Sequence, residues 1–373
     1  MQHQYRLYGL QISHFSGKLR GYLNYKGLDY EEKAPDLFDM VRRFPKKVGA
    51  AVVPVIETSS GEWLGDTTDI IEEFERRHPQ PSIATTTPKQ TIASMLFGAW
   101  CDDFWLPVSL HTRWSHPENY PVFRHELGKG LLPYAPNFVR NWLADNMAAA
   151  KMRDAAVAMG VVPNQVELLD QWIATMLDTL EQHFAQYDYL FGGRPTIADY
   201  SLLGCLYGHL SKDPWPRREL IAPRPHLKSY IERLHSGDRP RAGAPGELLP
   251  DDEIPATLLP MFSAIFNEFF PLLEKMVESV YQLIAGENLK KGDVLPRATK
   301  KVSCPMGNSR YERIARTFPL WMMQRIAKVL VNQPTDDRAA VRDWFASFGR
   351  GELLEMDLGP DVERAGLTVR LIK

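Results

Sequence analysis

The chain has 373 residues, of which 44% are hydrophobic and 24% are charged, and its formal net charge is −2. This length accommodates two or three domains with a sizeable buried core, and the composition excludes collagen-like, disordered and repeat proteins. The near-neutral charge provides no global field for nucleic acid or anionic lipid, so we expect neither partner.

The cysteines and apolar segments indicate the cellular compartment of the protein. Cys101, Cys205 and Cys304 are far apart and form no CxxC or zinc-ligand spacing. An odd number of dispersed cysteines is typical of a reducing compartment. Polar residues and a proline interrupt the apolar stretch at 262–273, which favours a buried helix over a membrane span. We therefore expect a cytoplasmic protein without a metal site and without a membrane-spanning segment.

The first 80 residues alternate between strand and helix patterns. Strands are expected near 5–10, 30–33, 52–57 and 62–64, with helices beginning near 16, near 37 and just before 70. The resulting β-α-β-α-β-β-α order predicts an α/β domain of thioredoxin-like layout at 1–80.

A segment rich in proline, threonine and serine at 78–88 is the expected linker to an all-helical domain at 89–245. The helices of this domain are predicted near 90–110, 136–157, 165–186, 196–210 and 225–235. An extension at 246–373 is expected to be mostly helical and to pack on the second domain. Its helices are predicted near 262–280, 311–331 and 338–348, and a short strand near 367–372.

The segment SHFSGKLR, which begins at Ser13, lies between the first strand and the first helix. The N–H groups and dipole of a helix N-terminus stabilise an anion, and a serine hydroxyl there could donate a hydrogen bond to a thiolate. Because Ser13 and Ser16 occupy both cysteine positions of a CxxC motif, disulfide chemistry within this corner is excluded. The alternative is that Ser13 or Ser16 only caps the helix.

The strongly β-forming run at 52–56 contains Pro54, which would remove a donor from a central strand. A cis Val53–Pro54 bond would resolve this conflict and would turn the Val53 backbone toward a peptide-like ligand. The alternative is a proline on an edge strand.

Asp66, Thr67 and Thr68 precede the third helix and are good N-cap residues. An additional role would be recognition of the amino-acid end of a ligand, with Asp66 contacting an ammonium group and Thr67 a carboxylate. By contrast, the capping box from Thr196 to Asp199 is expected to be structural.

These segments together resemble the cytosolic glutathione transferase superfamily over about 5–235. LYGLQISHFSGKLRGYLNYKGLDYEE is similar to the first strand, catalytic corner, first helix and second strand of that family. VVPVIE resembles its cis-proline strand, LGDTTDII its glutamyl-binding turn, and YLFGGRPTIADYSLLG the folding motif of its helical domain. The resemblance implies a thioredoxin-like domain followed by an all-α domain, to which this chain adds the extension.

The resemblance also implies residue roles, with glutathione as co-substrate. Ser13 would stabilise the thiolate, Val53 beside Pro54 would pair with the cysteinyl portion, and Asp66 with Thr67 would hold the γ-glutamyl end. The family usually has glutamate or glutamine followed by serine at these last two positions. A homodimer is implied as well.

The acceptor would be a small apolar or aromatic electrophile, and the family places it beside the first helices of the second domain. Trp105, His111 and Trp114 are the candidate pocket residues, although aromatic residues at this density also suit a core. The segment at 116–163 could cover the cleft. The predicted function is attack of glutathione on this electrophile. The alternatives are a glutathione-dependent lyase or isomerase, and a non-catalytic ligand-binding or partner-binding protein of the same fold.

Overall fold

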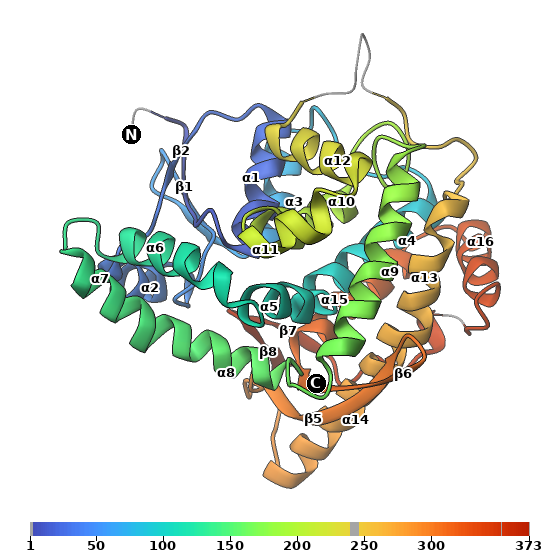
Figure 1. Ribbon diagram of the computed structural model, residues 1–373. Coiled ribbons are helices and arrows are strands. Elements are labelled where there is room, and N and C mark those ends of the chain that lie inside the picture. The colour runs from blue at the N-terminus through green and yellow to red at the C-terminus, as the bar shows by residue number, and fades with distance from the viewer. Residues whose placement is uncertain (1–2, 239–245, 352, 373) are drawn as a thin grey trace. The chain divides into compact units, whose positions relative to one another are not determined.

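The computed structural model describes residues 3–238, 246–351 and 353–372 (Figure 1). The chain divides into two compact units, each assembled from separate stretches. The first unit comprises Met1–Ile83, Leu106–Val157 and Asp199–Pro245, and the second comprises Ala84–Trp105, Ala158–Ala198 and Gly246–Lys373. The first break falls inside the segment at 78–88 that we expected to be a linker.

A four-stranded sheet with the order β2-β1-β3-β4 forms the base of the first unit. Its strands are β1 (Tyr5–Tyr8), β2 (Tyr30–Lys33), β3 (Val55–Thr58) and β4 (Trp63–Gly65). β2 runs parallel to β1, whereas β3 runs antiparallel to both β1 and β4. The helices of this domain are α1 (His14–Lys26), α2 (Phe44–Val48), which follows a π-helical turn at Asp39–Arg43, and α3 (Thr67–Arg77). The predicted α/β layout is confirmed.

The sheet register determines which loops meet. Tyr8 at the end of β1 pairs with Val55 at the start of β3, and Val55 pairs with Gly65 at the end of β4. The residues that follow β1, precede β3 and follow β4 therefore lie at one end of the sheet. These are the three segments in which the candidate site residues of the first domain occur.

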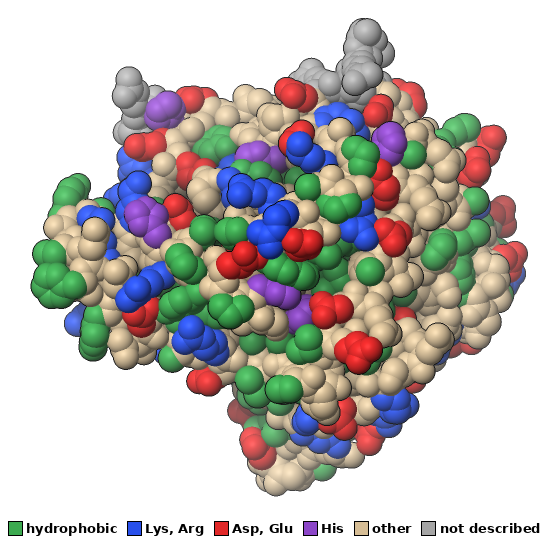
Figure 2. Space-filling view, in the orientation of Figure 1, with side chains coloured by type: hydrophobic (Ala, Val, Ile, Leu, Met, Phe, Trp, Pro, Cys, Tyr) green, Lys and Arg blue, Asp and Glu red, His purple; other side chains and the backbone are tan. Residues whose placement is uncertain are grey.

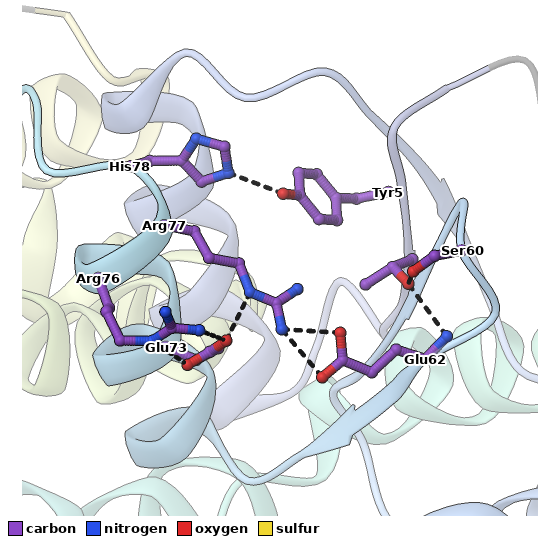
Figure 3. Close-up of polar contacts among 8 residues, drawn as sticks. Tyr5, Ser60, Glu62, Glu73, Arg76, Arg77 and His78 are labelled. Carbon is purple, nitrogen blue, oxygen red and sulfur yellow. Dashed lines mark hydrogen bonds and ion pairs between the residues drawn. The ribbon is translucent and has the colours of Figure 1, made fainter.

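A polar network occupies the opposite end of the sheet, where Tyr5 pairs with Thr58. Figure 3 shows Arg77 of α3 between two carboxylates, with its nitrogens 2.6 Å from Glu73 and 2.7 Å from Glu62. The Tyr5 hydroxyl lies 2.7 Å from Nε2 of His78 in the same view. Hydrogen bonds from Arg76 and Arg77 lower the pKa of Glu73 to about 2. We interpret this network as structural, because it ties α3 to the β3–β4 hairpin.

The first unit contains further helices beside those of the α/β domain, and the last of these in the chain packs against α1. They are α5 (Leu106–Trp114), α6 (Tyr120–Leu131), α7 (Asn137–Leu143), α8 (Ala150–Ala158), α10 (Ile197–Cys205), α11 (Pro214–Pro216) and α12 (Pro225–Ser236). Figure 1 shows α12 alongside α1, and Gly21 permits this close approach, because a Cβ there would lie 3.1 Å from the carbonyl oxygen of Leu234. The helices predicted near 136–157 and 225–235 are confirmed, whereas the one expected at 90–110 is two helices, α4 and α5.

The second unit joins two earlier helices to the extension. α4 (Pro88–Asp103) and α9 (Val166–Phe184) pack with α13 (Leu259–Ala264), α14 (Phe270–Glu287), α15 (Phe318–Val331) and α16 (Thr335–Ala346). Its strands are β5 (Ala298–Met306), β6 (Ser309–Arg316), β7 (Val362–Ala365) and β8 (Thr368–Leu371). The short C-terminal strand was predicted correctly, and the extension shares one core with α4 and α9.

The helix predicted from Tyr311 was wrong at its beginning. Tyr311 belongs to β6, which pairs with β5 in a hairpin, and the helix begins only at Phe318. Burial alternates along β6, so that Tyr311, Arg313 and Ala315 face inward with the period of a strand. The Gly307–Asn308 pair between two β-forming runs is the turn signal that could have identified this hairpin.

One helical stretch of the second unit, Ala256–Glu287, is long and apolar enough to cross a membrane by length and composition. However, 61% of its apolar window is buried inside the protein. Phe262 and Phe266 make edge-to-face ring contacts with Trp344 of α16. We therefore interpret this stretch as a core helix of the second unit.

Candidate active site

Ser13 is the N-cap of α1 and lies at the site end of the sheet. Its Oγ accepts a hydrogen bond of 3.3 Å from the Ser16 amide, which leaves the hydroxyl proton available to a further acceptor. The Ser16 side chain is fully buried, and its Oγ accepts a hydrogen bond from the Leu10 amide at 3.2 Å. The two serines therefore have different roles, and Ser13 is the one that could reach a ligand.

The helix that follows Ser13 supports an anion at this position. α1 spans 13 residues and has no acidic residue in its first turn. The unpaired N–H groups of a first helical turn and the helix dipole both favour negative charge within that turn. The corner therefore combines a hydroxyl donor with a positive helix end.

The Val53–Pro54 peptide bond is cis, which is one of the two possibilities that the proline inside the β run left open and the one that the family resemblance implied. Pro54 is buried, and Val53 is half-buried beside the cluster formed by Tyr8, Phe44 and Val55. Among the described residues, neither the amide nor the carbonyl of Val53 has a hydrogen-bond partner. Val53 thus presents one donor and one acceptor, the pair that an extended peptide requires.

Asp66 caps α3, as predicted, and its Oδ1 accepts a hydrogen bond of 2.8 Å from the Thr68 amide. Its backbone has a φ of 74° and a ψ of 125°, which lies outside the left-handed helical region and is uncommon for a residue other than glycine. Thr67 is the first residue of the helix, and its side chain is buried. The capping role is therefore confirmed, while contact of Asp66 and Thr67 with a ligand stays a prediction.

A buried arginine forms hydrogen bonds with the backbone next to Ser13. Arg113 of α5 donates to the carbonyl oxygens of Ile12 at 2.8 Å and Gly208 at 2.9 Å, and its Nε lies 2.8 Å from a carboxylate oxygen of Asp213. A Cβ at Gly208 would lie 2.7 Å from the Ser13 carbonyl oxygen, so only glycine fits there. The arginine therefore holds the residue immediately before Ser13 and the segment that packs against it.

The ion pair of Arg113 with Asp213 was not predicted from the sequence. Arg113 and Asp213 are 100 residues apart, and no local pattern links them. The one available signal was an arginine among the apolar positions of the helix at 106–114. A charge that is only 3% exposed requires a partner, and Asp213 supplies it.

The three predicted pocket residues have different environments. Trp114 is half-buried and packs against an apolar cluster that contains Ile12, next to Ser13. His111 is fully buried, and its Nδ1 lies 2.8 Å from Oγ of Ser115. Trp105 belongs to the second unit, where it is fully buried against Trp100 and Trp172. Only Trp114 therefore combines exposed surface with a position near the corner.

On the face drawn in Figure 2, neither sign of charge predominates. The face drawn in Figure 2 carries Lys and Arg side chains interspersed with Asp and Glu, as the formal net charge of −2 leads one to expect. Any recognition of charge must therefore come from local groups.

The fold and corner define a thioredoxin-like α/β protein in which a serine hydroxyl, and not a redox cysteine, stands at the helix N-terminus beside a cis-proline strand. Sequence models of the glutathione S-transferase N-terminal and C-terminal domains match residues 7–82 and 163–233. The chain belongs to the glutathione S-transferase superfamily. The extension at 246–373 lies beyond both matched ranges.

Individual relatives are distant. A maleylacetoacetate isomerase of Pseudomonas aeruginosa is 23% identical over 252 residues, which cover 63% of this chain and 97% of the relative. An isoprene-epoxide glutathione S-transferase of Rhodococcus sp. is 22% identical and covers 60% of this chain and 91% of its own. A glutathione S-transferase of Methylobacterium radiotolerans, solved with glutathione sulfonate, is 18% identical with a TM-score of 0.39, covering 66% of this chain and 99% of its own.

Proposed function

We propose that this protein is a glutathione-dependent transferase that activates the glutathione thiol for attack on a small electrophile. The observation that carries the proposal is the geometry of Ser13, whose Oγ accepts the Ser16 amide and whose proton is left to donate. A thiolate bound at this corner would receive that hydrogen bond at the positive end of α1.

These groups can supply the free energy that lowering the thiol pKa requires. A free thiol with a pKa of about 8.5 is roughly 3% ionised at pH 7. Lowering the pKa by about two units requires roughly 2.7 kcal/mol of preferential anion stabilisation. A hydrogen bond to a charged group contributes about 1.5–3 kcal/mol, and a helix N-terminus adds about 0.3–1 kcal/mol.

The peptide part of glutathione would bind along the same end of the sheet. The unpaired backbone groups of Val53 would pair with the cysteinyl residue, in the manner of an added strand. Asp66 would contact the ammonium group of the γ-glutamyl end, and the hydroxyl and amide of Thr67 its carboxylate. These contacts would hold the thiol at Ser13.

The electrophile would lie on the aromatic surface formed by Trp114 and Tyr120, which pack against the cluster around Ile12. Trp105 and His111 are left out of this pocket, because neither side chain has exposed surface. In the reaction, the thiolate sulfur forms a bond to an electrophilic carbon, and a leaving group departs with its electron pair or a conjugated double bond accepts the electrons.

A second candidate is glutathione-dependent isomerisation, which the likeness to a maleylacetoacetate isomerase favours. It would use the same thiolate but release glutathione at the end of each cycle. A product analysis distinguishes the two, because only the transferase yields a stable conjugate. Homodimer formation stays a prediction, and light scattering that gives the mass of one chain would contradict it.

The proposal is tested by calorimetric titration with glutathione together with the ultraviolet absorbance of the bound thiolate. We expect binding at millimolar or lower concentration and a thiol pKa below that of free glutathione. Absence of binding at millimolar glutathione would overturn the proposal. Binding without a lowered thiol pKa or any conjugate would instead support the non-catalytic alternative.

A further inference from the structure

Arg153 of α8 is an exposed residue whose guanidinium lies over two aromatic rings. It is 5.3 Å from the ring centroid of Trp114 and 4.8 Å from that of Tyr120. Both rings pack against the apolar cluster that contains Ile12, the residue before Ser13. A cation is therefore fixed above the aromatic surface beside the candidate thiolate corner.

This cation carries an uncompensated charge. The nearby carboxylate of Asp145 is already occupied, since it lies 2.6 Å from Arg124 and also accepts the Tyr120 hydroxyl. Within the described parts of the chain, Arg153 forms no ion pair with a carboxylate. Asp145 therefore pairs with Arg124, and the positive charge of Arg153 over the aromatic surface has no carboxylate of the described residues within ion-pair distance.

We propose that the electrophile accepted by this protein carries an anionic group, such as a carboxylate, on a flat apolar body, and that Arg153 recognises it. The planar guanidinium presents paired N–H donors that match a carboxylate, and the rings of Trp114 and Tyr120 would support the apolar body. This inference rests on the proposed transferase function and specifies its substrate class. It makes Arg153 a specificity-determining residue for the reaction.

The test compares two electrophiles that differ by one group, a chlorodinitrobenzene and the chlorodinitrobenzoate that adds only a ring carboxylate. With either compound, the sulfur of glutathione bonds to the carbon that bears chlorine, and chloride leaves with the electron pair of the C–Cl bond. The thiol proton passes to solvent. Each rate is divided by the uncatalysed rate with glutathione, so that intrinsic reactivity cancels.

We expect the normalised kcat/KM to favour the carboxylate compound by about tenfold or more, as the loss of one charge-assisted contact corresponds to about that factor. In R153Q this preference should disappear through a higher KM for the carboxylate compound, with the neutral compound little affected. R153K should retain part of it, because the charge remains while the planar fork is lost.

R325Q is the matched control, since Arg325 lies 4.8 Å over the ring of Trp321 and makes the same kind of contact in the second unit, which contributes no residue to the proposed site. It should keep the preference of the unaltered protein. An equal preference in the unaltered protein and R153Q, or no preference in the unaltered protein, would overturn the inference. Failure of the proposed function would show separately, as absence of glutathione binding in the calorimetric titration.

Discussion

At the scale of single residues, the two serines of the motif after β1 have different roles. Ser13 caps α1 and keeps a hydroxyl proton to donate, whereas Ser16 is fully buried and satisfies the Leu10 amide. The sequence motif alone does not show which of the two serines faces a ligand. Their burial and partners distinguish them.

We expect Ser13→Ala to raise the pKa of the bound glutathione thiol by about one to two units. A hydrogen bond to a charged group is worth about 1.5–3 kcal/mol, and one pKa unit corresponds to 1.36 kcal/mol. Thiolate absorbance as a function of pH measures the shift. Ser16→Ala is the control, because it should lower the free energy of unfolding and leave the thiol pKa in place. An unchanged thiol pKa in Ser13→Ala would contradict the role of Ser13.

The ligand-binding turn permits a second substitution at this scale. Asp66→Asn should preserve the N-cap of α3, since asparagine caps as well as aspartate does, but it removes the negative charge. We expect a KM for glutathione about tenfold higher, with kcat little changed, because the lost contact is to the ammonium end and not to the thiol. Steady-state kinetics with varied glutathione test this. A lower kcat with an unaltered KM would argue against ammonium binding by Asp66.

At the scale of elements, the corner depends on helices that come much later in the chain. Arg113 of α5 connects the Ile12 carbonyl, the Gly208 carbonyl and Asp213, and it is only 3% exposed. Burial raises the pKa of Asp213 and lowers that of Arg113, and each group partly offsets this effect on the other. Removing one partner would leave the other charged and buried.

We therefore expect Arg113→Met to lower the free energy of unfolding by about 3–5 kcal/mol, the cost typical of breaking a buried ion pair. It should also raise the thiol pKa, because Ile12 loses the hydrogen bond that fixes Ser13. Arg313→Met is the control, since Arg313 is equally buried, pairs with Asp103 at 2.9 Å and belongs to the second unit. Urea unfolding and thiolate titration of both variants provide the comparison. Equal thiol pKa values in the two variants would restrict Arg113 to a role in stability.

At the scale of the whole molecule, the extension is part of a core. Asp103 of α4 is 1% exposed and pairs with two residues of β6, Arg313 at 2.9 Å and Arg316 at 2.7 Å. The Trp172 indole of α9 donates to Glu268 at 2.8 Å, which also accepts the Gly307 amide at the β5–β6 turn. The extension therefore supplies the ion-pair and hydrogen-bond partners of buried polar groups on α4 and α9.

His183 connects α9 to the extension in a way that depends on pH. Its Nδ1 lies 2.7 Å from Oγ1 of Thr257, and its Nε2 lies 3.2 Å from the Tyr189 carbonyl. Burial lowers the pKa of His183 from its ordinary value of 6.5 to about 4. Below pH 6.5 the unfolded chain therefore takes up a proton that the folded chain does not, until pH falls to about 4.

The free energy of unfolding should consequently fall by about 3 kcal/mol between pH 6.5 and pH 4 through this residue alone. In this pH window, His183→Gln should reduce the slope of the free energy of unfolding against pH by the amount that corresponds to one bound proton. The variant will also be less stable than the unaltered protein at pH 7. Urea unfolding at a series of pH values measures both. A slope that the substitution leaves intact would assign the pH dependence to other groups.

The strength of the attachment of β6 to α4 can be tested in the same way. Asp103→Asn leaves Arg313 buried without a carboxylate, so we expect a loss of about 3–5 kcal/mol in the free energy of unfolding. Arg316→Met should cost less, because Arg316 is partly exposed and Asp103 keeps its other partner. Equal urea midpoints in the two variants would contradict the expected contribution of the Asp103–Arg313 pair.

The sequence by itself determined the features that depend on neighbouring residues. The strand and helix order of the first domain, the Ser13 corner, the Pro54 strand and the Asp66 cap could be predicted, because periodicity, caps and proline chemistry act over a few residues. The hairpin at β5 and β6 had a local signal too, in its Gly307–Asn308 turn, although the helical pattern around it obscured that signal.

Only the tertiary structure decided the rest, because it depends on pairs of groups far apart in the sequence. The Arg113–Asp213 ion pair spans 100 residues, and Arg313 reaches Asp103 across 210. The full burial of Trp105 and the excess charge at Arg153 depend on side chains from several helices. Burial and charge balance are sums over all neighbours in space, so a pattern read along the chain does not contain them.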